Sequence, residues 1–180
     1  MNYYISDLHF GWTNKHEGRT LEHDQMIIDN WNRVVTNADK VFILGDIGKE
    51  GGNTYNEYLC KCISVLKGNK YLIQGNHDKL KDARLRQLFV EIVPYKEILD
   101  NYNGLNHCLA LSHYPIMMFN GQHKGWVHLY GHLHTTPEER DYQEFLKELD
   151  GRIKVRDGDK YKPIRAYNVG CMMPYMDYKP

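Results

Sequence analysis

The chain alternates short apolar runs with longer segments in which apolar residues recur at helical spacing. From Ile27 onward, residues 21–36 place apolar side chains at positions i, i+4, i+7 and i+8, which predicts an amphipathic helix. Residues 55–67 repeat this pattern and end at Gly68, and residues 79–89 form a weaker third helix. The alternation of strand-like and helical segments predicts an α/β fold.

A fourth helix has the clearest start in the sequence. Thr136 is expected to cap it, with Pro137 at its first position and Glu139 completing a capping box. Tyr142 begins its apolar stripe, and Gly151 is expected to end the helix.

Five of the apolar runs share one feature: each is followed by a small residue and then by an acidic, amide or imidazole side chain. These endings are Ser6-Asp7-Leu8-His9, Gly45-Asp46, Gly75-Asn76-His77-Asp78, Ser112-His113 and Gly131-His132-Leu133-His134. In open α/β sheets, ligands bind beyond the carboxyl ends of the strands. If the five strands are neighbours that run the same way, all five endings converge on one edge.

The side chains at these endings are typical of a transition-metal site. They comprise carboxylates, an amide and imidazoles without a thiolate, a mixture that suits Zn, Mn, Fe, Co or Ni better than Ca or Mg. The set is Asp7, His9, Asp46, Asn76, His77, His113, His132 and His134. It exceeds the needs of one ion and suits two ions about 3.5–4 Å apart, as in phosphate-ester hydrolases. Asp46 stands alone at its strand end and is the natural bridge between two ions.

Taken in order, the five motifs resemble the calcineurin-like metallophosphoesterase superfamily. Its pattern reads Asp-x-His, Gly-Asp, Gly-Asn-His-Asp or Gly-Asn-His-Glu, a small residue with His, and Gly-His-x-His. His23, Asn30-Trp31-Asn32 and Asn168-Val169-Gly170-Cys171 are similar to a branch of small soluble members. The resemblance implies a two-layer β sandwich flanked by helices, α/β/β/α, with a dinuclear metal centre at one edge.

The resemblance also implies a role for each residue. The first ion would be held by Asp7, His9 and His134, the second by Asn76, His113 and His132, and both by Asp46. His77 would protonate the leaving oxygen, with Asp78 as its orienting partner. The protein would then be a metal-dependent phosphoric ester hydrolase, in which a hydroxide bridging two Mn, Fe, Zn or Ni ions attacks phosphorus.

One departure from the better-known members bears on the substrate. Ile47-Gly48-Lys49 follows Asp46 where the protein Ser/Thr phosphatases carry an Asp-Arg pair that clamps phosphoprotein phosphate. A phosphodiester or a small nucleotide-like ester is therefore the expected substrate. Arg19 and His16, in a polar loop after His9, are candidate substrate-binding residues. Residues 136–162 are expected to control access to the site, with ordinary packing as the alternative.

Length and composition bound the remaining possibilities. With 180 residues and a formal net charge of zero, the chain is expected to form one domain, residues 1–180, without bulk attraction to nucleic acid or anionic membrane. No run approaches about 18 apolar residues, so no membrane partner is expected. The four scattered cysteines and the absence of a signal-peptide pattern favour the cytoplasm.

Two alternative functions stay open at this level, together with the oligomeric state. A metal-free interaction scaffold on the same fold would typically lack several of the ligand histidines. A nuclease acting on polymeric nucleic acid would need a basic groove, for which the lysines and arginines of residues 67–86 are candidates.

Overall fold

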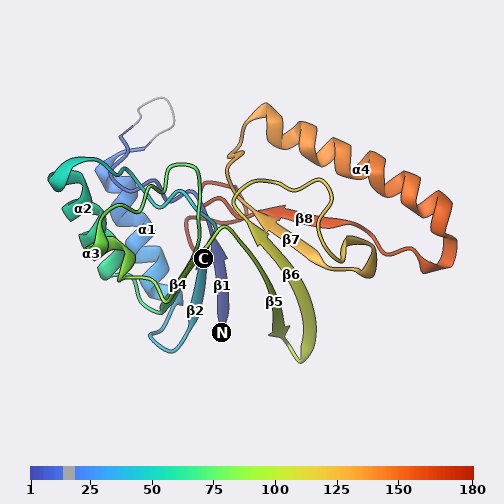
Figure 1. Cartoon of the computed structure of the whole chain (residues 1–180), viewed down its shortest axis with the longest axis horizontal. Helices are drawn as coiled ribbons and strands as arrows, with labels where there is room; N and C mark the ends of the chain where they lie inside the picture. The colour runs from blue at the N-terminus through green and yellow to red at the C-terminus, as the bar shows by residue number, and fades with distance from the viewer. Residues whose placement is uncertain (14–18) are drawn as a thin grey trace.

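Two four-stranded sheets form the centre of the protein (Figure 1). The computed structural model describes residues 1–13 and 19–180. The first sheet is parallel throughout, in the order β1 (Asn2–Ile5), β2 (Lys40–Ile43), β3 (Asn69–Ile73) and β4 (Glu91–Val93). In the second sheet, β5 (Tyr95–Tyr102) pairs antiparallel with β6 (Leu105–Ser112), and β7 (Val127–Tyr130) and β8 (Arg165–Asn168) continue it in parallel.

The helices lie on the two outer sides of this pair of sheets (Figure 1). The first sheet is covered by α1 (Leu21–Val34), α2 (Gly52–Ser64) and the short α3 (Ala83–Arg86), and the second by α4 (Pro137–Asp157). Two 3-10 turns, η2 (Gln122–Lys124) and η3 (Gly158–Lys160), complete the described elements. The resulting order of layers, α/β/β/α, confirms the predicted fold class.

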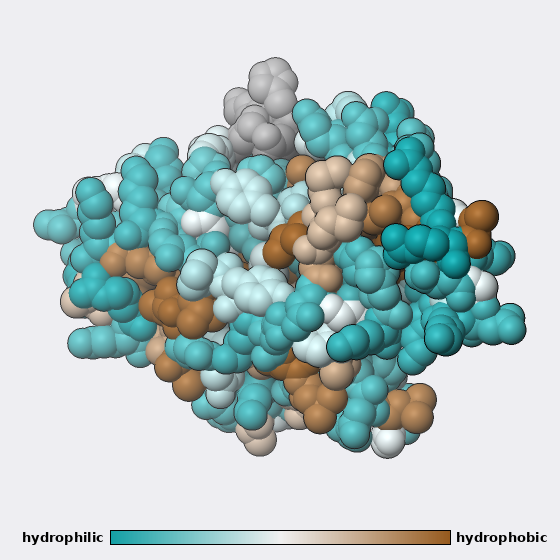
Figure 2. Space-filling view, turned by 45° about the vertical axis from the view of Figure 1, so that its right-hand side comes forward, coloured by the Kyte–Doolittle hydropathy of each residue, from teal (hydrophilic) through white to brown (hydrophobic). Residues whose placement is uncertain are grey.

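Two apolar clusters hold the first helical layer and the two sheets together. One lies under α1 and α2, where the buried Trp31 ring also donates its indole N–H to the carbonyl of Lys67 at 2.9 Å. The other joins the two sheets through side chains such as Phe42, Ile73 and Leu111. Burying these side chains removes apolar surface from water, and the second cluster fixes the sheets against each other. Outside the clusters, hydrophobic side chains gather in separate patches on an otherwise hydrophilic face (Figure 2).

Helix α4 differs from its prediction at both ends. It continues through Gly151 to Asp157, because Ile153 extends the buried stripe of Tyr142 and Leu146 by two further turns. The expected capping box is absent: the Thr136 hydroxyl donates to the Leu133 carbonyl, and the Glu139 carboxylate accepts bonds from Tyr130 and Asn168 instead.

The same contacts support ordinary packing, the alternative interpretation of residues 136–162, and a role in access to the site stays a prediction. Tyr142 and Leu146 of α4 pack with Tyr130 and Ala166 of the second sheet. Gln143 adds a hydrogen bond of 2.7 Å to the Tyr130 hydroxyl. The helix is therefore the outer layer of the second sheet, which was the alternative interpretation of this segment.

Candidate metal centre

The predicted ligands meet where the ends of the two sheets converge. Asp7 and His9 follow β1, Asp46 follows β2, and Asn76 follows β3. The other three come from the second sheet, where His113 follows β6 and His132 and His134 follow β7. The strands are thus divided between two sheets and do not share the single sheet edge expected from the sequence. The Ser6 N–H donates to the Val169 carbonyl at 2.8 Å and so links the ends of the two sheets, while the Asp7 N–H donates to the Gly45 carbonyl at 3.0 Å within the first sheet.

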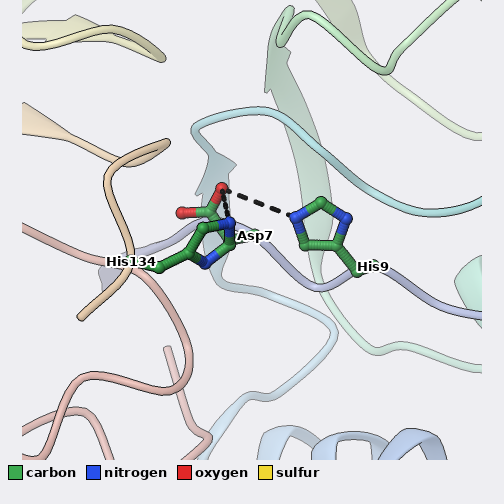
Figure 3. A group of neighbouring side chains, drawn as sticks. All are labelled: Asp7, His9 and His134. Atoms are coloured by element: carbon green, nitrogen blue, oxygen red, sulfur yellow. Dashed lines mark ion pairs between the residues drawn. The ribbon is translucent and has the colours of Figure 1, made fainter. Parts of the chain in front are cut away.

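The first group of ligand atoms belongs to Asp7, His9 and His134 (Figure 3). Asp7 Oδ1 lies 3.9 Å from His9 Nε2 and 4.0 Å from His134 Nε2. The other carboxylate oxygen, Oδ2, accepts the Ser6 hydroxyl at 2.6 Å and the His132 backbone N–H at 3.0 Å. The same His132 N–H lies 3.2 Å from Oδ1, so backbone fixes the Asp7 carboxylate while Oδ1 faces the two imidazoles.

The second group belongs to Asp46, His113 and His132, and Asn76 joins it. His113 Nδ1 donates to the Leu44 carbonyl at 2.7 Å, so Nε2 is the ring nitrogen that faces the other candidate ligands. That Nε2 atom lies 3.4 Å from Asp46 Oδ2 and 2.9 Å from Asn76 Oδ1. An imidazole nitrogen, a carboxylate oxygen and an amide oxygen thus lie close together in the second group.

Asp46 connects the two groups. Its Oδ2 atom lies 3.4 Å from His113 Nε2 in the second group and 3.6 Å from His9 Nε2 in the first. Its Oδ1 atom accepts the backbone N–H of His77 at 3.0 Å. Burial would raise the pKa of this carboxyl, but the hydrogen bond from His113 and the charge on that ring hold it at about 2. Asp46 is therefore a carboxylate shared between two clusters of imidazoles.

Three features of this cluster fit divalent ions. Ligand atoms about 2.1 Å from one ion lie roughly 3–4 Å apart, as these atoms do. Both ring nitrogens of the buried His9 have no hydrogen-bond partner among the described residues, and burial lowers the pKa of His9 to about 2, which keeps the ring neutral. A neutral, unpartnered imidazole inside a protein is a good metal ligand and otherwise costs free energy.

The third feature is the backbone of the ligands themselves. Five of the seven adopt the left-handed conformation, with φ of 58° at Asp7, 47° at His9, 55° at Asp46, 70° at His132 and 50° at His134. This conformation costs about 1–2 kcal/mol at a residue with a Cβ atom and clusters at functional sites. Two glycines give the ligands room, since a Cβ atom at Gly131 would collide with Ser6 Oγ and one at Gly75 with Asp46 Oδ1.

One side of the cluster is open to solvent. Asp7, His9, Asp46 and His113 are buried, whereas the Asn76 side chain is exposed and His77, His132 and His134 are half-buried. A substrate can therefore approach from the side of Asn76 and His77.

The structure places the two predicted catalytic residues differently from each other. The His77 ring stands at the open side, with its centroid 5.8 Å from that of His9. Asp78 is buried, and its carboxylate accepts the backbone N–H groups of Asp46, Ile47 and Gly75 at 2.8–2.9 Å. Burial raises the pKa of Asp78 to about 6 in spite of these bonds. The Asp78 carboxylate thus joins the loops after β2 and β3 and is engaged with backbone, not with the His77 ring.

Of the two candidate substrate residues, Arg19 lies outside this open side. Arg19 is 2% exposed, and its Nη2 atom lies 3.3 Å from His134 Nδ1, so it adjoins a candidate ligand from inside the protein. Its role as a substrate contact remains a prediction. His16 lies outside the described residues.

Two aromatic residues at the site were not predicted from the sequence. The Trp12 ring is 4.9 Å from His77 and 5.4 Å from His9, and the Tyr114 ring is 4.4 Å from His132, centroid to centroid. Their signal in the sequence was only their place, directly after His113 for Tyr114 and three residues after His9 for Trp12.

The fold and the clustered ligands define a class of α/β proteins that carry metal ligands where two sheets meet. Residues 3–169 match the family described as calcineurin-like phosphoesterase, and the chain belongs to that family. Its members bind divalent metals and usually hydrolyse phosphoesters.

Three similar proteins match this chain over most of its length. An uncharacterized protein of Methanocaldococcus jannaschii, MJ1445, is 30% identical over 171 residues, which cover 90% of this chain and 85% of that protein. The Gene 66 protein of Mycobacterium phage D29 is 30% identical over 161 residues, or 74% of this chain and 78% of its own. The crystal structure of a protein of unknown function from Aquifex aeolicus, AQ665, matches with a TM-score of 0.65 at 25% identity, covering 100% of this chain and 94% of the other. Among the described helices, none has the length and apolar character needed to cross a membrane.

Proposed function

We propose that this protein hydrolyses a small phosphate ester, with a phosphodiester or nucleotide-like ester favoured, at a centre of two divalent ions. The observation that carries the proposal is the position of Asp46, whose Oδ2 atom lies within 3.6 Å of an imidazole nitrogen in each ligand group. The donor set of carboxylate, amide and imidazole suits Mn, Fe, Zn or Ni. When bound, two such ions supply positive charge to the phosphoryl oxygens and an activated water as nucleophile.

The residues of the chain divide the remaining work between them. Asp7, His9 and His134 would hold one ion and Asn76, His113 and His132 the other, with Asp46 shared. The hydrolysis consumes one water, breaks the P–O bond to the leaving group and forms a new P–O bond to the water oxygen. The half-buried ring of His77 lies at the open side, where it would donate a proton to the departing oxygen. Asp78 would position Asp46 and the Gly75 loop through backbone bonds.

The preference for diesters rests on charge at the open side. A monoester dianion usually recruits a bidentate arginine. Among the described residues of this cluster, those that open to solvent are an amide and three imidazoles, and Arg19 lies buried beside His134. A diester carries one negative charge less, and its difficulty is the poorly departing alkoxide, which His77 would assist.

Two further properties are part of the proposal. The four cysteines of the chain are free, which supports a reducing compartment such as the cytoplasm. The expected partner is a small-molecule ester.

The experiment is a substrate panel run under Mn, Fe(II), Zn and Ni, with bound metal counted on the same samples. We expect bis-nitrophenyl phosphate to be cleaved faster than nitrophenyl phosphate, and Asp46→Asn to lose metal and activity together. No cleavage of any ester in protein that holds two ions would contradict the proposal. A monoester preference of about tenfold, abolished by Arg19→Ala, would overturn the diester preference alone.

A further inference from the structure

Aromatic rings flank the two ligand groups at different ends. The Trp12 ring contacts the ring of His9, which belongs to the first group, and the ring of His77, the candidate proton donor. Tyr114 meets the rings of His132 and His113, at 4.4 and 5.3 Å, and both of these belong to the second group. The open side of the site is therefore bordered by a different aromatic side chain at each end.

The segment that carries Tyr114 is held firmly by its backbone. The Tyr114 carbonyl accepts the Ser112 hydroxyl at 2.6 Å. Ile116 donates its N–H to His128 Nε2 at 3.1 Å and accepts the Tyr142 hydroxyl at 2.9 Å. Both of these partner side chains are buried, so the segment is fastened to the core.

The same segment nevertheless presents apolar side chains to solvent. Tyr114 and Met117 are each 51% exposed and Met118 is 62% exposed. Because the backbone is fixed, this exposure belongs to the folded segment. An exposed tyrosine ring on a fixed backbone is a surface that suits a flat aromatic group, since aromatic rings attract each other in stacked and edge-on arrangements.

We propose that Tyr114 is a specificity-determining residue, which packs against a planar aromatic group on the ester substituent that stays on phosphorus. The proposal rests on the proposed function. His77 must face the leaving oxygen, and Trp12 lies beside His77, so the leaving group belongs to the Trp12 end. An in-line displacement places the attacking water opposite the leaving group, so the retained substituent lies to the side of that axis, where the exposed Tyr114 ring borders the site. The substrate class is a diester whose retained group carries a flat ring, such as a nucleoside.

The test compares two diesters that share one leaving group. Phenyl nitrophenyl phosphate and methyl nitrophenyl phosphate both release nitrophenolate and differ only in the retained group. Tyr114→Ala should lower kcat/KM for the phenyl ester by roughly tenfold, the usual range for a lost stacking contact, and leave the methyl ester within about twofold. Tyr114→Phe keeps the ring and should behave as the unmodified protein. Tyr102→Ala removes a tyrosine of similar exposure, 57%, at the far end of β5 and should change neither substrate.

A binding measurement separates this inference from the proposed function. Phenylphosphonate and methylphosphonate cannot be hydrolysed, and calorimetry on the manganese-loaded protein gives their Kd values. We expect a phenyl preference that Tyr114→Ala abolishes. If no ester is cleaved but this preference is found, the proposed function fails and the subsite stands. If Tyr114→Ala affects the phenyl and methyl compounds equally, or affects neither, the subsite is wrong. Should Tyr114→Ala not fold, Tyr114→Leu, which keeps apolar bulk without a ring, decides by the same comparison.

Discussion

The histidines of this protein differ in what their two ring nitrogens meet. His128 lies inside β7, fully buried, with Nδ1 2.9 Å from the Ala110 carbonyl and Nε2 accepting the Ile116 N–H. Both of its nitrogens are engaged by backbone, so it is a core residue. Neither nitrogen of His9 has a hydrogen-bond partner among the described residues, and in His113 the backbone engages Nδ1 alone, while Nε2 faces the oxygens of Asn76 and Asp46. A ring nitrogen that the backbone does not engage identifies the imidazoles that are available to an ion.

The buried His128 predicts a pH dependence of stability. Burial lowers its pKa to about 4, whereas the unfolded chain takes up this proton near its ordinary pKa of about 6.5. As the pH falls through that window, the unfolded state binds the proton first and stability is lost, by about 2 kcal/mol at about pH 5. His128→Gln retains an acceptor for Ile116 but does not titrate. The loss of unfolding free energy between about pH 7.5 and pH 5, measured with urea, should be smaller in the variant by that amount. Equal losses in the two proteins would show that His128 does not carry the effect.

Replacement of His77 by alanine tests the proton donor. His77→Ala should keep its metal, because its ring lies outside both ligand groups, and lose about 10²–10⁴-fold in kcat. The loss should be smallest for nitrophenolate, which leaves without protonation, and largest for alkoxide leaving groups. Kinetics across such a series, with metal counted by elemental analysis, provide the check. A variant that no longer retains metal would make His77 a ligand instead of a proton donor.

At the scale of elements, local patterns predicted the first two helices and the five ligand-bearing strands, and failed where long-range contacts decide. The third predicted helix shrinks to α3, since Leu80 adopts a left-handed φ of 51° and Asp82 caps the helix only from Ala83 onward. β5 was not predicted from the sequence, because its alternate residues are only half-buried and it has no continuous apolar run. The Glu139 carboxylate bonds to Tyr130 and Asn168 rather than to its own helix, which no local pattern reveals.

The same distinction applies to the site. All seven candidate ligands could be named from the sequence, because each follows a strand in a recognisable motif. Trp12 and Tyr114 could not, since nothing in their own motifs separates a ring beside an imidazole from an ordinary surface aromatic. The role of Asp78 was equally hidden, because its partners are backbone groups of another loop.

The contacts of Asp78 make it a test of how the loops after β2 and β3 are joined. Asp78→Asn replaces an oxygen acceptor with an amide nitrogen, which leaves buried N–H groups unsatisfied and should cost about 1–3 kcal/mol of unfolding free energy. Because Asp46 moves with that loop, metal affinity should fall as well. Urea unfolding of the metal-free protein and a metal titration measure the two effects. Asp141→Asn, the same change at an exposed position of α4, is the matched control and should alter neither. Unchanged affinity and stability in Asp78→Asn would rule out the positioning role.

For the molecule as a whole, metal binding should stabilise the fold. Ions bind the folded state alone, because the ligands come from distant parts of the chain, and each ion at about 100 times its Kd adds about 2.7 kcal/mol. For a domain of this size, two ions should raise Tm by about 10 °C or more. Thermal melts with manganese and with a chelator measure this shift, and elemental analysis should find two ions per chain. In Asp46→Asn the shift should largely vanish, since a neutral amide bridges two cations poorly. Saturation at a single ion would defeat the two-ion arrangement.

The division of the ligands between two sheets has a consequence for protein synthesis. The first group is incomplete until His134 has been synthesised, and the second until His113 and His132 have been. Asp7 and His9, in contrast, leave the ribosome at the very start. A nascent chain can therefore complete neither group until its second sheet has emerged and docked. A product truncated anywhere before residue 132 would carry no complete set of ligands, so only chains translated through the second sheet would take up the metal pair.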